Sequence, residues 1–203
     1  MSTDKNSSAL PRRRLSREAR YQQLIEAAWQ LIRTEGTEAL TLGRLAEQSG
    51  VTKPVVYDHF GTRSGLFAVL YQEFDARQNA LFDAALVQSE ATLSARAQVM
   101  AESYVNCVQK QGREIPGIIA ALVGSPELEQ IKRAYEVAFI EKCRETLTPF
   151  TGGKSLSNAG LWAMLGAAES VAYASTRNEI TEQQARDELY AVIMALVERS
   201  VGT

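Results

Sequence analysis

Apolar side chains recur every three or four positions between residues 17 and 34. The stripe consists of Tyr21, Leu24, Ile25, Ala28, Leu31 and Ile32. This spacing places them on one face of an α-helix, so the segment predicts a helix that buries that face. Ser16 can cap the helix at its start, and Gly36 can end it.

The same spacing returns in a shorter segment over about residues 42–48. Its apolar positions are Leu42, Leu45 and Ala46. Thr41 is a good N-cap for this second helix. Gly50 then breaks it, because glycine readily adopts the left-handed backbone conformation that a sharp turn between helices requires.

A third helix is predicted after Thr52, which can cap it, with Pro54 in the first turn, where a missing N–H costs nothing. Two short helices joined by a glycine-containing turn form a helix-turn-helix, whose second helix enters the major groove of DNA. We expect Val56 and Phe60 to face the core. The groove-facing candidates are Lys53, Pro54, Val55 and Tyr57.

Beyond residue 66 the helical pattern continues and strand patterns are absent. A fourth helix over 63 to about 87 should pass from this head into the rest of the chain. Helix starts are predicted at Ser125-Pro126-Glu127 and at a capping box from Thr181 to Gln184. The last two helices are expected over about 156–175 and 182–201, which makes the chain all-α.

Two motifs of the head resemble the TetR family of transcriptional regulators. One runs from Leu45 to Lys53, and the other comprises residues 56–60 (VYDHF) followed by Arg63. The close resemblance covers residues 16 to 70; the remainder is compatible in length and helical character. It implies a DNA-binding head that the family keeps similar, and a ligand-binding body that varies.

The resemblance also assigns roles to individual residues of the head. Thr41 and Tyr57 would touch phosphates, and His59 and Arg63 would add further phosphate contacts, whereas Arg44 would reach the backbone or the groove. The full candidate set is Thr41, Arg44, Thr52, Lys53, Pro54, Val55, Tyr57, His59 and Arg63. Structural alternatives stay open, including helix capping by His59 and a purely solvated Lys53 or Arg44.

Charge is distributed unevenly along the chain. Residues 1–65 hold ten Lys or Arg against seven Asp or Glu, whereas residues 66–203 hold twelve against seventeen. The head is therefore net positive by three and the remainder net negative by five, which favours DNA binding at the head only modestly. Residues 1–15 form a basic arm, expected to be flexible, that can contact DNA or remain a solvated tail.

Composition sets the number of domains. With 203 residues and 45% hydrophobic content, the chain can bury a sizeable core, and one head plus one larger body account for its length. We predict an arm over 1–15, a helix-turn-helix domain over 16–65, and a ligand-binding and dimerisation domain over 66–203.

Motifs of an enzyme are missing from the sequence. His59 is the only histidine, which excludes sites that need two, and there is no glycine-rich phosphate loop or nucleophile elbow. Cys107 and Cys143 lack metal or redox spacing and are expected to be reduced, buried side chains. We expect no enzyme activity, cofactor, metal, signal peptide or membrane span, and a cytoplasmic location.

The last two helices are expected to form a homodimer, because the family dimerises through a four-helix bundle built from this region. One helix carries the small residues Gly160, Ala163, Ala167, Ser170 and Ala174. The other carries the apolar stripe Leu189, Val192, Ile193, Leu196 and Val197. Dimerisation also suits DNA reading, since a two-fold dimer doubles the contacts on a palindromic site. Alternatively, these helices only close the core of one chain.

A pocket for a moderately hydrophobic small molecule is expected among the middle helices. Its candidate lining is Tyr104, Cys107, Val108, Ile118, Leu122, Tyr135, Phe139 and Trp162. The sequence thus predicts a repressor that binds a palindromic operator as a dimer and is released by a small effector. An activator, or a helical interaction module without an effector, remains the alternative.

Overall fold

The computed structural model describes residues 15–114, 117–118, 120 and 126–202, and all regular structure in them is helical. The N-terminal elements are α1 (Arg17–Glu35), η1 (Thr37–Ala39), α2 (Leu42–Ser49), α3 (Lys53–Phe60) and α4 (Arg63–Gln88). The remaining elements are α5 (Leu93–Glu114), α7 (Pro126–Leu147), η2 (Thr148–Phe150), α8 (Asn158–Thr176) and α9 (Glu182–Gly202). The all-α prediction is confirmed. Residues 1–14 of the predicted arm, including the basic residues 12–14, lie outside the described residues.

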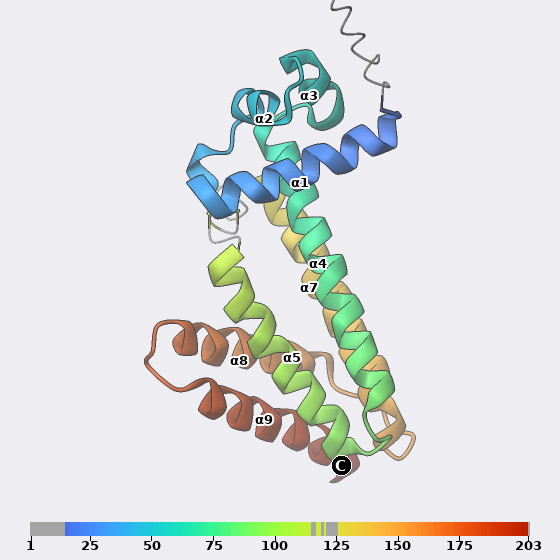
Figure 1. Cartoon of the computed structure of the whole chain (residues 1–203). Helices are drawn as coiled ribbons and strands as arrows, with labels where there is room; N and C mark the ends of the chain where they lie inside the picture. The colour runs from blue at the N-terminus through green and yellow to red at the C-terminus, as the bar shows by residue number, and fades with distance from the viewer. Residues whose placement is uncertain (1–14, 115–116, 119, 121–125, 203) are drawn as a thin grey trace, which may run out of the picture.

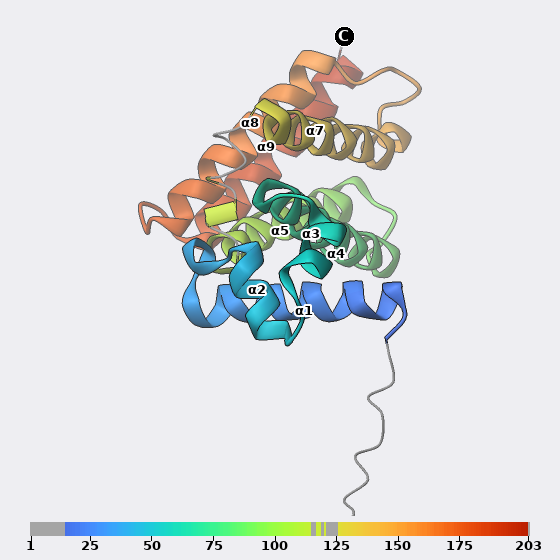
Figure 2. The ribbon, with the colours of Figure 1, turned by 90° about the horizontal axis from the view of Figure 1, so that it is seen from above.

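Helices α1, α2 and α3 form a head at one end of the molecule, and α4 runs from it into the body (Figure 1). Ser16 caps α1 by accepting a hydrogen bond from the Ala19 N–H at 3.1 Å, as predicted. Gly36 ends α1 with φ of 85°, a value that favours glycine. Seen from above, α1 lies across the head beside α2 and α3 (Figure 2).

One apolar cluster fills the head and continues into α4. Leu24 and Leu31 of α1 and Leu45 of α2 are fully buried in it together with Leu66 and Leu70 of α4. The cluster therefore crosses the boundary predicted at residue 65, and the first half of α4 packs as part of the head.

Ile118 joins the same cluster, although it was predicted to line a ligand pocket. Its side chain is fully buried among the residues of the head. Beside it, Gly117 lies so close to η1 that a Cβ there would stand 2.6 Å from the Thr37 Cβ. Residues 117 and 118 thus contact the head, which corrects the assignment of Ile118 to the pocket.

Helices α8 and α9 pack side by side across α5 and close the body (Figure 1). Leu189, Ile193, Leu196 and Val197 of α9 are buried in the core of this chain. A Cβ at Gly160 of α8 would lie 2.6 Å from the Leu196 Cδ1. This part of the predicted dimerisation stripe therefore packs within one chain, and α8 instead exposes Ala163, Ser170 and Tyr173.

The predicted capping box is present at the start of α9. The Thr181 N–H donates to the Gln184 Oε1 at 2.8 Å, and the Gln184 N–H donates to the Thr181 Oγ1 at 3.1 Å. Cys143 is buried and Cys107 half-buried. None of the described helices combines the length and apolar character that crossing a membrane requires.

Candidate functional site

The turn between α2 and α3 has the geometry that the sequence predicted. Thr41 accepts a hydrogen bond from the Arg44 N–H at 3.0 Å through its side chain and so caps α2. Gly50 has φ of 63° and ψ of 35°, the left-handed conformation, and the following Val51 N–H donates to the Ala46 carbonyl at 3.0 Å. These local bonds fix the position of α3 relative to α2.

Helix α3 presents one face to the core and another to solvent. Val56 and Phe60 are buried, as predicted. Lys53, Pro54 and Tyr57 are exposed, and half of the Tyr57 surface (52%) is accessible. A buried tyrosine would need a partner within the protein for its hydroxyl. Tyr57 is exposed instead, so its side chain is available to an external partner.

The side chains of Lys53 and Thr41 lie close together at the N-terminal end of α2. A Cβ at Gly43 would contact the Lys53 Cε at 3.5 Å and the Thr41 Oγ1 at 3.9 Å, so both side chains border this glycine. Within the described part of the chain Lys53 makes no ion pair. The structure thus brings the Thr41 hydroxyl and the Lys53 ammonium group onto one surface. Gly43 lies between these two side chains, and the sequence did not reveal its position.

The remaining candidates on α3 have mixed environments. Thr52 occupies the N-cap position and is exposed, but its side chain makes no capping hydrogen bond. Val55 and His59 are half-buried. The His59 ring lies 6.0 Å from the rings of Tyr21 and Phe60, which fixes its position at the edge of the head.

Asp58 is an exposed carboxylate on α3 that the sequence analysis left out. The period of a helix turns position 58 away from the buried positions 56 and 60, and this spacing could have identified it. A carboxylate repels phosphates but can accept a hydrogen bond from the amino group of cytosine.

The two predicted arginines are engaged inside the head. Arg44 forms an ion pair of 2.6 Å with Glu35, and its hydrogen bond lowers the pKa of that carboxyl group. Arg63 donates to the Leu40 carbonyl at 2.8 Å and to the Thr37 carbonyl at 3.1 Å, and it lies over the Phe67 ring. These contacts give both arginines a structural role in the head, and Lys53 is the better candidate for a cation that meets phosphate.

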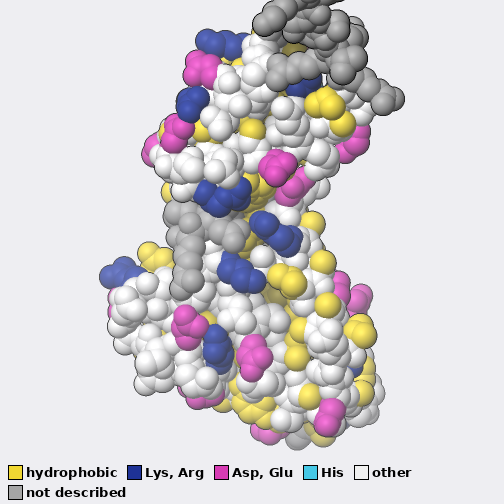
Figure 3. Space-filling model, in the orientation of Figure 1, with side chains coloured by type: hydrophobic (Ala, Val, Ile, Leu, Met, Phe, Trp, Pro, Cys, Tyr) yellow, Lys and Arg dark blue, Asp and Glu magenta, His cyan; other side chains and the backbone are white. Residues whose placement is uncertain are grey.

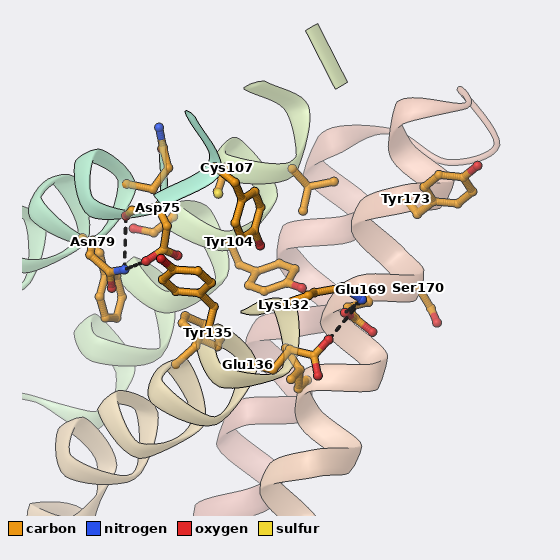
Figure 4. A pocket seen from close by; sticks show the side chains of 17 residues that line it. Asp75, Asn79, Tyr104, Cys107, Lys132, Tyr135, Glu136, Glu169, Ser170 and Tyr173 are labelled. Atoms are coloured by element: carbon orange, nitrogen blue, oxygen red, sulfur yellow. Dashed lines mark hydrogen bonds and ion pairs between the residues drawn. The ribbon is translucent and has the colours of Figure 1, made fainter. Parts of the chain in front are cut away.

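A cavity of about 480 Å³ lies in the body between α4, α5, α7 and α8 (Figure 4). Its volume is in the range of small-molecule sites. Six aromatic rings line it: Tyr71, Phe82, Tyr104, Tyr135, Phe139 and Tyr173. Its polar lining comprises Asp75, Gln78, Asn79, Ser103, Lys132, Glu136, Glu169 and Ser170, and Cys107, Val108 and Leu165 complete the wall.

Five residues of the predicted pocket do line this cavity, whereas Trp162 and Ile118 do not. The five are Tyr104, Cys107, Val108, Tyr135 and Phe139. Trp162 instead packs against Arg133, whose Cζ lies 3.8 Å from the centre of the Trp162 ring. It is not part of the cavity lining. Ile118 belongs to the head cluster, and Leu122 lies outside the described residues.

Comparison with known proteins identifies the head. Residues 24–75 match the family model of the bacterial regulatory proteins of the tetR family. The head is therefore a TetR-family DNA-binding domain. Proteins of this family are DNA-binding transcriptional regulators, a class without enzymatic activity.

Solved structures of the family share the fold over nearly the whole chain. A TetR transcription regulator from Haloarcula marismortui matches with a TM-score of 0.70 and 13% identity, covering 88% of this chain and 98% of that one. A tetR-family regulator from Streptomyces coelicolor gives 0.68 and 19%, covering 93% and 90%. The fatty acid degradation regulator FadR from Bacillus halodurans gives 0.66 and 14%, covering 86% and 94%. No curated protein matches the chain in sequence.

The cavity has polar groups at two ends (Figure 4). On α4, Asn79 donates a hydrogen bond of 2.8 Å to the Asp75 carboxylate. On α7 and α8, Lys132 pairs with Glu136 at 3.0 Å and with Glu169 at 3.8 Å. Of the residues in these clusters, only Glu169 was a candidate from the sequence for a polar group in the pocket. The two clusters could not be predicted, because a charged residue on a helix is usually solvated and its spacing does not show that it faces a cavity.

Burial sets the electrostatics of the cavity wall. It raises the pKa of the Asp75 carboxyl group, more than the Asn79 hydrogen bond and the charge of Lys142 lower it. Burial likewise raises the pKa values of the Tyr71 and Tyr104 hydroxyls, so both side chains are neutral. Among the described residues, no three His, Cys, Asp or Glu side chains gather where they could hold a metal ion.

Proposed function

We propose that this TetR-family regulator represses transcription as a homodimer on a palindromic operator, and that a small molecule in the body releases it. One observation carries the proposal: α4 joins the core of the head to the cavity of the body. Leu66 and Leu70 belong to the core of the head, whereas Asp75 and Asn79, further along the same helix, line the cavity. A ligand that shifts this part of α4 therefore changes the position of the head.

The proposed DNA-contacting surface combines the start of α2 with the exposed face of α3. It comprises Thr41, Thr52, Lys53, Pro54, Val55, Tyr57 and His59. Lys53, Tyr57 and Thr41 would bind phosphate, because they supply one ammonium group and two hydroxyls on one exposed surface. Pro54 and Val55 would meet bases through apolar contacts.

A physical argument favours a dimer as the form that binds DNA. A single eight-residue recognition helix reads only a few base pairs, and a two-fold dimer doubles the site that is read. The exposed surface of α8 suits a close approach of two chains, because it presents the small side chain of Ala163; the exposed Ser170 and Tyr173 also line the cavity.

Selection of bound fragments from random or source-genome DNA tests the proposal, followed by fluorescence anisotropy of the selected site across a salt series. We expect a palindrome that binds two chains, with affinity that falls steeply as salt rises. Reporter transcription with and without the protein then separates repression from activation. Absence of any selected sequence at low salt would contradict the proposal and favour an interaction module.

A further inference from the structure

Asp75 is a carboxylate in the cavity wall that lacks a cationic partner among the described residues. Among the described side chains, Asn79 donates hydrogen bonds of 2.8 Å to the Asp75 carboxylate and 3.1 Å to the Asp75 carbonyl. Lys142, the cation whose charge acts on Asp75, is itself paired with Asp83 at 2.7 Å. Asp75 is therefore a half-buried carboxylate without an ion pair in the described part of the chain.

The other charges of the cavity are already balanced or negative. Lys132 lies between two carboxylates, Glu136 and Glu169, so it has little positive charge to offer to an anion. The wall holds three carboxylates, those of Asp75, Glu136 and Glu169, against this one ammonium group. An anionic ligand would thus be repelled overall.

Aromatic rings surround Asp75 on the side of the cavity. The Tyr71 and Tyr135 rings meet edge to face with centroids 5.3 Å apart. Burial, and after it the charge of Asp75, raises the pKa of both hydroxyls. Deeper in the wall, the Tyr104 and Phe139 rings are 5.5 Å apart. The faces of aromatic rings attract cations, especially where water is excluded.

We infer that the cavity takes an organic cation, a molecule with an apolar body and an ammonium group that Asp75 neutralises between Tyr71 and Tyr135. Figure 4 shows Asp75 and Tyr135 together at the α4 side of the cavity, across from the Lys132 cluster. The cation site itself is inferred from the cavity wall. Only the statement that this ligand is the effector rests on the proposed function. Burial of Asp75, which raises its pKa, adds support, because a bound cation would restore the interactions that the carboxylate lost on leaving water.

Three probes with the same apolar part test the inference: a phenylbutyl chain that ends in trimethylammonium, hydroxyl or carboxylate. Binding of each to the full chain is measured by calorimetry. We expect the ammonium probe to bind about tenfold more tightly than the alcohol, and the carboxylate to bind most weakly. Asp75→Asn should remove the preference for the cation and leave the affinity for the alcohol within about twofold.

Glu73→Gln is the matched control, because it removes one negative charge from α4 outside the cavity lining and leaves the ion pair of Lys142 with Asp83 intact. It should leave all three affinities within about twofold. Thermal unfolding of both variants shows whether each is folded. The wild-type comparison of the three probes needs no variant.

Equal or tighter binding of the alcohol or the carboxylate in the wild type would overturn the inference, as would absence of ammonium binding or an unchanged preference in Asp75→Asn. DNA binding is measured separately on the selected operator. An operator that binds while the cation does not leaves the regulator proposal intact. A cation that binds at Asp75 without any effect on DNA binding supports the site and contradicts its role as the effector site.

Discussion

At the scale of the residue, exposure and partners separate the cations of the head. Lys53 is exposed without an ion pair among the described residues, whereas Arg44 and Arg63 are held by Glu35 and by the carbonyls of η1 and Leu40. Lys and Arg side chains are interspersed with Asp and Glu over the visible face of the head (Figure 3). Individual side chains, and not the modest net charge, therefore determine where DNA can bind.

Lys53→Ala should weaken DNA binding without destabilising the head, because the side chain is exposed and makes no ion pair with the described residues. If Lys53 meets a phosphate, the slope of log affinity against log salt should fall by about 1 per contact. Fluorescence anisotropy across a salt series measures the slope. Lys110→Ala, an exposed lysine on α5, is the control and should change nothing. An unchanged slope in Lys53→Ala would remove this residue from the proposed surface.

Arg63→Lys should lower the stability of the chain even though it keeps the positive charge. Lysine lacks the planar fork with which Arg63 donates to the Leu40 and Thr37 carbonyls, and losing these bonds should cost about 1–3 kcal/mol. Urea unfolding of Arg63→Lys and Arg63→Ala measures this cost. A lysine variant with wild-type stability and weakened DNA binding would restore Arg63 to the phosphate contacts.

Asp75→Asn should raise the thermal stability of the ligand-free protein at neutral pH by about 1–3 °C. The pKa of Asp75 is raised by burial, so its ionised form costs stability above that pKa, and asparagine imitates the neutral form. The gain should disappear below about pH 4, where the carboxyl group is protonated in both the folded and the unfolded chain. Calorimetric scans across pH measure it; a gain that does not depend on pH would reject the titration of Asp75 as its cause.

At the scale of the element, features that depend on residues close in sequence, such as helix starts, could be predicted. Contacts between residues far apart in sequence could not. The ends of α1, α2 and α9 follow from the caps Ser16 and Thr41 and from the box at Thr181, whose partners are three residues away. Arg63 was assigned differently because its partners lie 23 and 26 residues upstream. Likewise, the apolar stripe of α9 does not reveal whether it meets its own chain or a second one.

Gly65→Ala should destabilise the helix-turn-helix. A Cβ at Gly65 would stand 2.2 Å from the Phe60 carbonyl oxygen, a backbone atom that cannot move aside, so the start of α4 would shift away from α3. We expect a cost of about 1–3 kcal/mol, typical of overpacking. Urea unfolding compares it with Gly43→Ala, where the nearest atom is 3.5 Å away and alanine should stabilise α2 by up to about 1 kcal/mol. Similar effects at the two glycines would contradict this reading.

At the scale of the whole molecule, the head and the body share α4 and the contact of residues 117–118 with the head. Gly117 borders Thr37, and Ile118 is buried in the head cluster. A change in the body thus reaches the head through two segments. The sequence predicted α4 as a connection, but the second contact depends on the folded arrangement and lay beyond pattern analysis.

Binding of DNA and of a cavity ligand should therefore weaken each other by the same factor. This reciprocity is required of any two sites that are coupled through the protein. Calorimetry of the ammonium probe with and without saturating operator measures one factor, and anisotropy of the operator with and without probe measures the other. Glu73→Gln, which leaves the cavity lining unchanged, should preserve both. Two factors that differ beyond error would indicate that the probe acts on the DNA or at another site.

The continuous core across residue 65 has a practical consequence for hybrid regulators. A head cut at residue 65 would leave behind Leu66, Leu70 and Phe74, which are buried against α1 and α2. The truncated head would expose its own apolar face and be prone to aggregate. Chimeras that graft this head onto another body are better joined after Phe74, within α4, with the helical register kept across the junction.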